Sequence, residues 1–125
     1  MFRKYNPNPS RLHVGDCVIR SITSATGDIW ENVYIELALQ GYMMHDMPSA
    51  NRVWGEYLHN HGFKRRIIPD SCPDCYTVKD FCEDYPQGTY VVSTGTHAVC
   101  VKDGDYYDTW DSGNEPVIFY WTKEE

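Results

Sequence analysis

The sequence has no long apolar run and little positive charge. No segment approaches the roughly 20 consecutive apolar residues that a membrane-spanning helix needs, although 42% of the 125 residues are hydrophobic. The net charge is −7, whereas a general nucleic-acid-binding domain is usually basic. The composition therefore predicts one globular domain, residues 1–125, with neither a membrane nor a nucleic acid as partner.

Further absences concern targeting, disulfides and cofactors. The first residues, Met1 to Pro7, carry charge but no apolar core of a signal peptide, so we expect a cytoplasmic location. Five cysteines are an odd number, which fits free thiols or a metal site better than a disulfide framework. The sequence also lacks a glycine-rich phosphate loop, glycosidase-like paired carboxylates and internal repeats. We expect no cofactor.

Apolar spacing and turn residues predict helices mainly in the first half of the chain and strands in the second. Helices are expected over 17–26, 28–40, 49–60 and from Thr77 to before Pro86. Strands are expected over 88–94, 97–102, 105–110 and 117–121. Residues 1–14 are expected to form a coil arm and 63–76 an irregular segment. Helices followed by an antiparallel meander predict an α+β domain.

Two local patterns sharpen the helix boundaries. Asp28 followed by Glu31 is a capping-box pattern, with Asp28 as N-cap of the second helix. Gly27 and Gly41 are predicted to end the first and second helices, because glycine readily adopts the left-handed conformation found there.

The stretch Gly15-Asp16-Cys17 is the most informative part of the chain. A small residue, an aspartate that caps helices and an apolar-patterned run predict a loop turning into a helix, with Cys17 in its first turn. A thiol there lies at the positive end of the helix dipole, which favours the thiolate. Taken alone, Cys17 is more simply explained as a small buried residue.

Two residues far downstream change that interpretation. Asp103-Gly104 between two predicted strands predicts a two-residue hairpin turn. Counting back from this turn places Asp108 diagonally across from His97, within hydrogen-bonding reach. A three-residue turn would shift the register by one and set Asp111 opposite His97 instead. The spacing leaves Asp108 and Asp111 as alternative acids behind His97.

A cysteine, a histidine and an acid are the parts of an activated thiol nucleophile. The thiol is a weak nucleophile near neutral pH until a histidine takes its proton. An acid behind the histidine fixes the tautomer and orientation of the imidazole. Cys17 on a helix with His97 and Asp108 on a sheet would meet where the two elements pack. The sequence therefore predicts a Cys–His–Asp site.

These segments resemble the papain-like cysteine peptidase superfamily, in particular its compact bacterial and phage branch related to the C39-like peptidases. Gly15-Asp16-Cys17 opens a helix, His97-Ala98-Val99 opens a strand, and Asp108-Thr109-Trp110 ends the next strand. The resemblance implies a papain-like fold with N-terminal helices packed on a C-terminal antiparallel sheet. It favours Asp108 over Asp111, and it implies that Trp110 covers the His–Asp pair, with Asp16 in a supporting place.

The resemblance also implies an activity. A thiol-dependent hydrolase would cleave a peptide, isopeptide or amide bond of a protein or peptide substrate through a thioester on Cys17. Acyl transfer and deamidation use the same chemistry. A second hypothesis from another class is a catalytically idle papain-like fold that serves as a protein-interaction or inhibitor module.

The chain departs from the superfamily at one position. The superfamily usually has a glutamine about six residues before the cysteine that donates to the oxyanion hole, whereas position 11 here is arginine. The candidate oxyanion donors in place of this glutamine are the backbone N–H of Cys17 together with Asn6, Asn8, Arg11 or His13. Such a donor typically contributes a factor of about 10²–10³ to the rate.

Cys72 and Cys75 form a separate CxxC pattern. Structural zinc needs about four ligands, and only Cys82, His59 and His61 are available to complete such a site. A redox CxxC normally opens a helix in a thioredoxin-like unit, which is not predicted here. We expect a plain turn and no metal, with Cys82 in the core.

Overall fold

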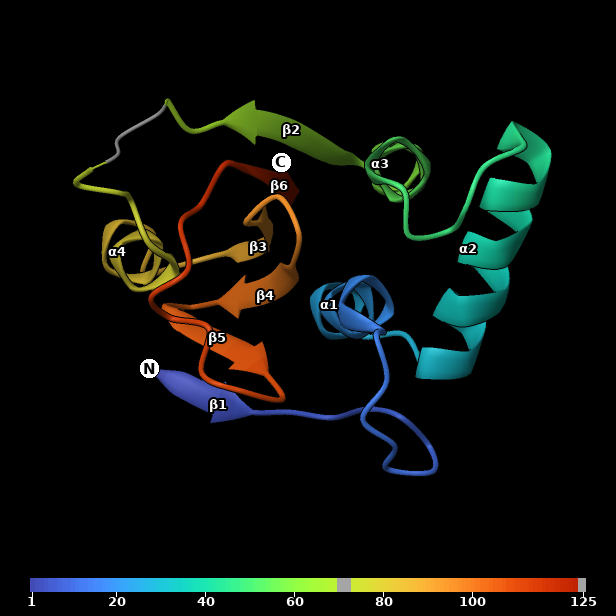
Figure 1. The fold of residues 1–125 in the computed structure, drawn as a ribbon, viewed down its shortest axis with the longest axis horizontal. Helices are drawn as coiled ribbons and strands as arrows, with labels where there is room; N and C mark the ends of the chain where they lie inside the picture. Colours follow the sequence, from blue (N-terminus) through green and yellow to red (C-terminus); the bar gives the residue numbers. More distant parts are fainter. Residues whose placement is uncertain (70–72, 124–125) are drawn as a thin grey trace.

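Within residues 1–69 and 73–123, which the computed structural model describes, the chain forms four helices and a six-stranded mixed sheet (Figure 1). The helices are α1 (Cys17–Thr26), α2 (Trp30–Met44), α3 (Asn51–Asn60) and α4 (Val78–Asp84). The strands are β1 (Phe2–Lys4), β2 (Phe63–Ile67), β3 (Thr89–Ser93), β4 (Ala98–Lys102), β5 (Asp105–Asp108) and β6 (Phe119–Lys123). The predicted α+β class is confirmed. None of the described helices is long and apolar enough to cross a bilayer.

The two faces of the sheet bury separate apolar cores. Side chains alternate between the faces along a strand, so neighbouring residues Val91 and Val92 of β3 belong to different cores. One core lies against α1, α2 and α3, and the other lies against α4, on the opposite side of the sheet (Figure 1). The chain is therefore layered as helices, sheet and helix, and α1 packs directly on β4.

Helix α1 begins at Cys17 and ends before Gly27, as predicted. Gly27 has a φ of 75° and its N–H donates to the carbonyl of Thr23, which closes the last turn. Asp16 occupies the N-cap position, but its side chain makes no capping hydrogen bond. The expectation that the Asp16 carboxylate caps the helix is wrong, because that carboxylate binds other partners described below.

Helix α2 differs from the prediction at both ends. It begins at Trp30 with Ile29 at the N-cap and no side-chain cap, so the predicted Asp28–Glu31 capping box does not form. The Asp28 carboxylate instead accepts the Ile29 N–H and the Asn32 amide. The helix also continues through Gly41 to Met44.

Gly41 is required for close packing rather than for ending the helix. A Cβ atom at this position would lie 2.7 Å from the backbone oxygen of Asp46 and 3.1 Å from the backbone nitrogen of Pro48. Helix α2 ends later, at Met44, and the next residue, His45, adopts the left-handed conformation with a φ of 57°. The chain then folds back tightly against the last turns of α2.

The sheet is neither purely C-terminal nor purely antiparallel, contrary to the expectation. Strand β1, predicted as coil, pairs in parallel with β5, and Phe2 packs on the ring of Tyr106 at 5.6 Å between centroids. Strand β2 lies in the segment predicted as irregular, yet it pairs with β6 at the sheet edge. Strand β6 also pairs with β3 rather than with β5, so the last four strands do not form a simple meander.

The β4–β5 hairpin forms in the predicted register. Asp103 and Gly104 have φ values of 50° and 82°, as a two-residue turn with two positive φ angles requires. Lys102 pairs with Asp105, and Cys100 pairs with Tyr107. This register brings the end of β5 beside the start of β4, where the candidate site lies.

We predict that Gly41→Ala lowers the free energy of unfolding. Helix propensity alone would make this change stabilising by about 1 kcal/mol, but the added methyl must displace backbone atoms, which costs about 1–3 kcal/mol. Urea denaturation should therefore give a lower midpoint for the variant. Gly15→Ala is the control, since a Cβ atom there meets nothing within 4 Å; a Gly41→Ala protein as stable as this control would contradict the packing argument.

Candidate active site

A cleft of about 730 Å³ lies where the first turn of α1 faces the start of β4 and the segment after β5. Cys17 and His97 both line it, and Trp54, Trp110 and His13 contribute to its walls. The cleft therefore contains two of the three predicted catalytic residues, and the third lies directly behind it.

Asp108 is the acid that the structure places behind His97. Its side chain is fully buried, and Oδ2 lies 2.6 Å from Nε2 of His97. The hydroxyl of Ser112 donates to the same oxygen at 2.7 Å, and the backbone N–H of Thr109 donates to Oδ1 at 2.8 Å. Burial would raise the pKa of Asp108, but the hydrogen bonds from His97 and Ser112 outweigh it and lower the pKa.

Asp111, the alternative acid, is engaged elsewhere. Its carboxylate accepts hydrogen bonds from the Tyr106 hydroxyl and from the backbone N–H of Gly113. The two-residue turn thus resolves the ambiguity left by the sequence: the register brings Asp108, not Asp111, to the imidazole of His97.

The thiol of Cys17 faces the other side of the same imidazole. Because Nε2 of His97 bonds to Asp108, Nδ1 is the ring nitrogen that remains for the thiol. Burial would raise the pKa of Cys17, but hydrogen bonds with His97 and with the backbone of Ala98, and the positive charges of His97 and Arg20, lower it. The site therefore favours a thiolate.

His97 has the complementary shift. Burial would lower its pKa, but hydrogen bonds to Asp108 and Cys17 and the charges of both groups raise it to about 9. The Trp110 ring packs against the imidazole, 4.9 Å between centroids, although Trp110 itself is 45% exposed. Trp110 therefore lies against the ring of His97, and the opposed shifts of the Cys17 and His97 pKa values favour proton transfer from the thiol to the imidazole.

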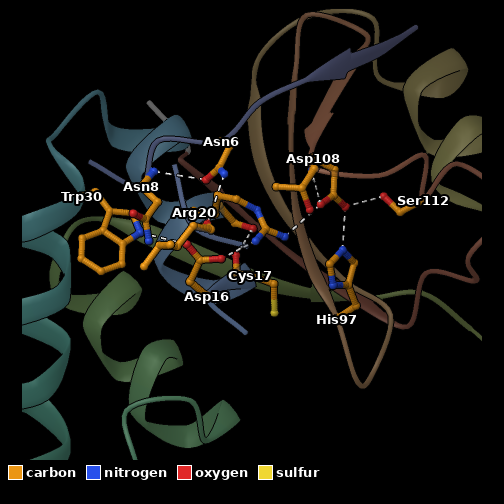
Figure 2. Close-up of polar contacts among 12 residues, drawn as sticks. Asn6, Asn8, Asp16, Cys17, Arg20, Trp30, His97, Asp108 and Ser112 are labelled. Carbon is orange, nitrogen blue, oxygen red and sulfur yellow. Dashed lines mark hydrogen bonds and ion pairs between the residues drawn. The ribbon is translucent and has the colours of Figure 1, made fainter. Parts of the chain in front are cut away.

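Arg20 is a member of the site that sequence reasoning missed. Its guanidinium is buried and hydrogen-bonds to two carboxylates, Oδ1 of Asp16 and, at 2.9 Å, Oδ1 of Asp108 (Figure 2). The second oxygen of Asp16 accepts the indole N–H of Trp30 at 2.9 Å. Asp16 thus anchors Arg20 and α2 rather than capping α1.

A sequence signal for Arg20 existed. Asp16 and Arg20 are four residues apart, with the acid first, which is the favourable spacing for an ion pair on a helix. Arg20 also lies within the apolar-patterned stretch from Val18 to Ile22, where a charged residue is unexpected. What the sequence alone did not reveal is that Asp108, 88 positions later, reaches the same guanidinium.

The oxyanion candidates occupy two kinds of position. Asn6 and Asn8 support the arm that precedes α1: the side-chain amide of Asn6 donates to the Leu12 carbonyl, and the side-chain oxygen Oδ1 of Asn8 accepts the Ser10 N–H. His13, by contrast, lines the cleft with Cys17. Arg11 is exposed and adopts a φ of 59° in the same arm.

Two further free thiols, Cys82 and Cys100, do not line the cleft. Cys82 is a free, buried member of the core against α4, and Cys100 is free and fully buried in β4. Cys72 lies outside the described residues. Cys75 is disulfide-bonded, so the expectation of a free thiol is wrong at this position. In the part of the chain that the structure describes, no group of three or more His, Cys, Asp or Glu side chains is arranged to hold a metal ion.

Comparison of the chain with protein-family models, with curated proteins and with solved structures finds no match. The case for function therefore depends on the geometry of the site.

We predict that the pKa of His97 falls when either of its partners is changed. The larger fall is expected in Asp108→Asn, because the hydrogen bond to Asp108 is the greater of the favourable influences, and the smaller in Cys17→Ala. Titration of the His97 ring protons by NMR measures both. Since about 9 exceeds the usual value near 6.5, the stability contributed by this protonation is complete below about pH 6.5 and is lost as pH rises through about 9. An unchanged His97 pKa in Asp108→Asn would contradict the assigned pairing.

Proposed function

We propose that the protein is a small papain-like thiol hydrolase that cleaves a peptide, isopeptide or amide bond in a protein or peptide substrate. The observation that carries this proposal is the line of Cys17, His97 and Asp108. The thiol has a lowered pKa, the imidazole a raised one, and a buried carboxylate lies 2.6 Å behind it. Opposed shifts in adjacent groups are typical of an activated nucleophile.

The reaction would proceed through a thioester. The Cys17 thiolate attacks the acyl carbon, and the imidazolium of His97 gives its proton to the leaving amine as the carbon–nitrogen bond breaks. Neutral His97 then takes a proton from water, whose oxygen attacks the thioester carbon. The carbon–sulfur bond breaks, the carboxylic acid leaves, and the thiolate–imidazolium pair is restored. Asp108 keeps the Nε2 proton of His97 in place throughout.

The developing oxyanion needs hydrogen-bond donors near the first turn of α1. The backbone N–H of Cys17 is suited to this role, because the first N–H groups of a helix have no intrahelical acceptor. His13 lines the same cleft and is our candidate for the second donor, in place of the glutamine that papain-like enzymes usually carry.

The architecture is compatible with this assignment. The nucleophile begins a helix that packs on the sheet, the base precedes β4, and the acid ends β5. This order of elements supports a papain-like fold as part of the proposal.

We predict that Cys17 reacts with iodoacetamide well below pH 7, and that His97→Ala moves this reactivity to the pH range of an ordinary thiol, near 8.5. Site-resolved mass spectrometry measures alkylation of each cysteine across the pH range. Cys82 and Cys100 are internal controls, since burial raises the pKa of each to about 11. An inert Cys17, or one that titrates like an ordinary thiol, would favour the idle interaction module instead.

The hydrolytic step is tested with peptide and isopeptide libraries. Turnover should disappear in Cys17→Ala and fall by roughly 10²-fold or more in Asp108→Ala. Mass spectrometry of rapidly quenched reactions should find an acyl group on Cys17. A reactive Cys17 that forms no acyl adduct with any library would count against hydrolysis.

A further inference from the structure

We propose that Arg20 is a positioning residue, which holds the Asp108 carboxylate ionised and oriented behind His97 and fixes α1, with its nucleophile, against the end of β5. This inference rests on the proposed function, because it concerns how the same site is held ready.

The first argument is charge balance in a buried place. Asp16 and Asp108 are 5% and 0% exposed, and Arg20, at 5%, is the cation that hydrogen-bonds to both. A buried carboxylate without a compensating charge tends to take up a proton. His97 compensates Asp108 only while it is protonated, and it gives up that proton during the proposed reaction. Arg20 keeps its charge at every stage, so Asp108 stays ionised when His97 is neutral.

The second argument is geometric. Arg20 lies in α1, three residues after Cys17, whereas Asp108 ends β5. The 2.9 Å bond between them therefore ties the helix that carries the nucleophile to the strand that carries the acid. Asp16 holds the other side of the guanidinium, and the Trp30 indole holds Asp16. Figure 2 shows this chain of contacts running from α2 to the imidazole of His97.

Two uncharged groups also bind the Asp108 carboxylate, so the distinct contribution of Arg20 is its positive charge. The Ser112 hydroxyl and the Thr109 N–H orient the carboxylate, but neither carries charge. The charged or titratable groups bonded within this network are Asp16, Cys17, Arg20, His97 and Asp108. Removing Arg20 therefore leaves two buried carboxylates with the imidazolium as the sole compensating cation among them.

The test measures the pH profile of Cys17 alkylation, which requires no substrate. In Arg20→Gln we expect the profile to move to higher pH, with a rate at pH 6 lower by about threefold or more. Arg20→Lys keeps a charge but has no planar guanidinium to bind both carboxylates. Its Cys17 alkylation profile should therefore lie between those of the wild type and Arg20→Gln. In an Asp108→Asn background, Arg20→Gln should have a smaller effect, because only the direct attraction between the Arg20 charge and the thiolate is then lost.

The matched control is Arg3→Gln. Arg3 also binds an aspartate of β5, Asp105 at 3.1 Å, but on the exposed surface, and its loss should leave the Cys17 profile unchanged. A folded Arg20→Gln protein with the wild-type profile would overturn the proposal, as would an equal effect of Arg20→Gln in the Asp108→Asn background.

Two further outcomes are separated by design. If Arg20→Gln does not fold, Arg20→Lys is compared with and without Asp108→Asn, and a wild-type profile for Arg20→Lys overturns the proposal. If His97→Ala abolishes the low-pH reactivity while folded Arg20→Gln retains it, the role of Arg20 fails alone. If wild-type Cys17 titrates like an ordinary thiol, both the proposed function and the role of Arg20 fail.

Discussion

The burial of the Asp108 carboxylate is the constraint on which the rest of the site depends. A charged group without solvent contact must be satisfied by the protein, and Asp108 has four partners: His97, Ser112, the Thr109 N–H and Arg20. Arg20 comes from α1, His97 precedes β4, and Thr109 and Ser112 both belong to the loop after β5. Satisfying one charge therefore fixes the relative positions of α1, the start of β4 and the loop after β5, all of which contribute residues to the cleft.

The layered fold explains how so polar a cluster is tolerated. Apolar packing is divided between the two faces of the sheet, with Val91 and Trp121 on one side and Val92 and Tyr120 on the other. The polar cluster sits at the rim, where the strands end and α1 begins (Figure 2). The cores can supply stability without having to accommodate the site, and the polar network need only be internally satisfied.

Much of this arrangement could be predicted from the sequence where the signal is local. The start of α1 at Cys17, its end at Gly27 and the two-residue turn at Asp103-Gly104 each depend on a few adjacent residues, and the hairpin register then paired Asp108 with His97. Features set by distant contacts were missed. Strand β2 buries only Phe63, so it has no alternating pattern and is specified by its pairing with β6. Likewise, β1 is specified by its pairing with β5. The role of Arg20 depends on its contact with Asp108, which is 88 positions away in the sequence.

The Asp108 carboxylate, which both His97 and Arg20 bind, also determines which substitution best inactivates the proposed site. The Cys17 sulfur lies at the open end of the network, where the cleft begins, so replacing it removes one thiol and leaves the buried charges balanced. Asp108 and Arg20 lie at the centre, so a change at either alters the chemistry and the scaffold together. For the proposed hydrolase, a substrate-trapping variant is therefore best built at position 17, where a substitution removes the reacting atom and leaves the network behind it intact.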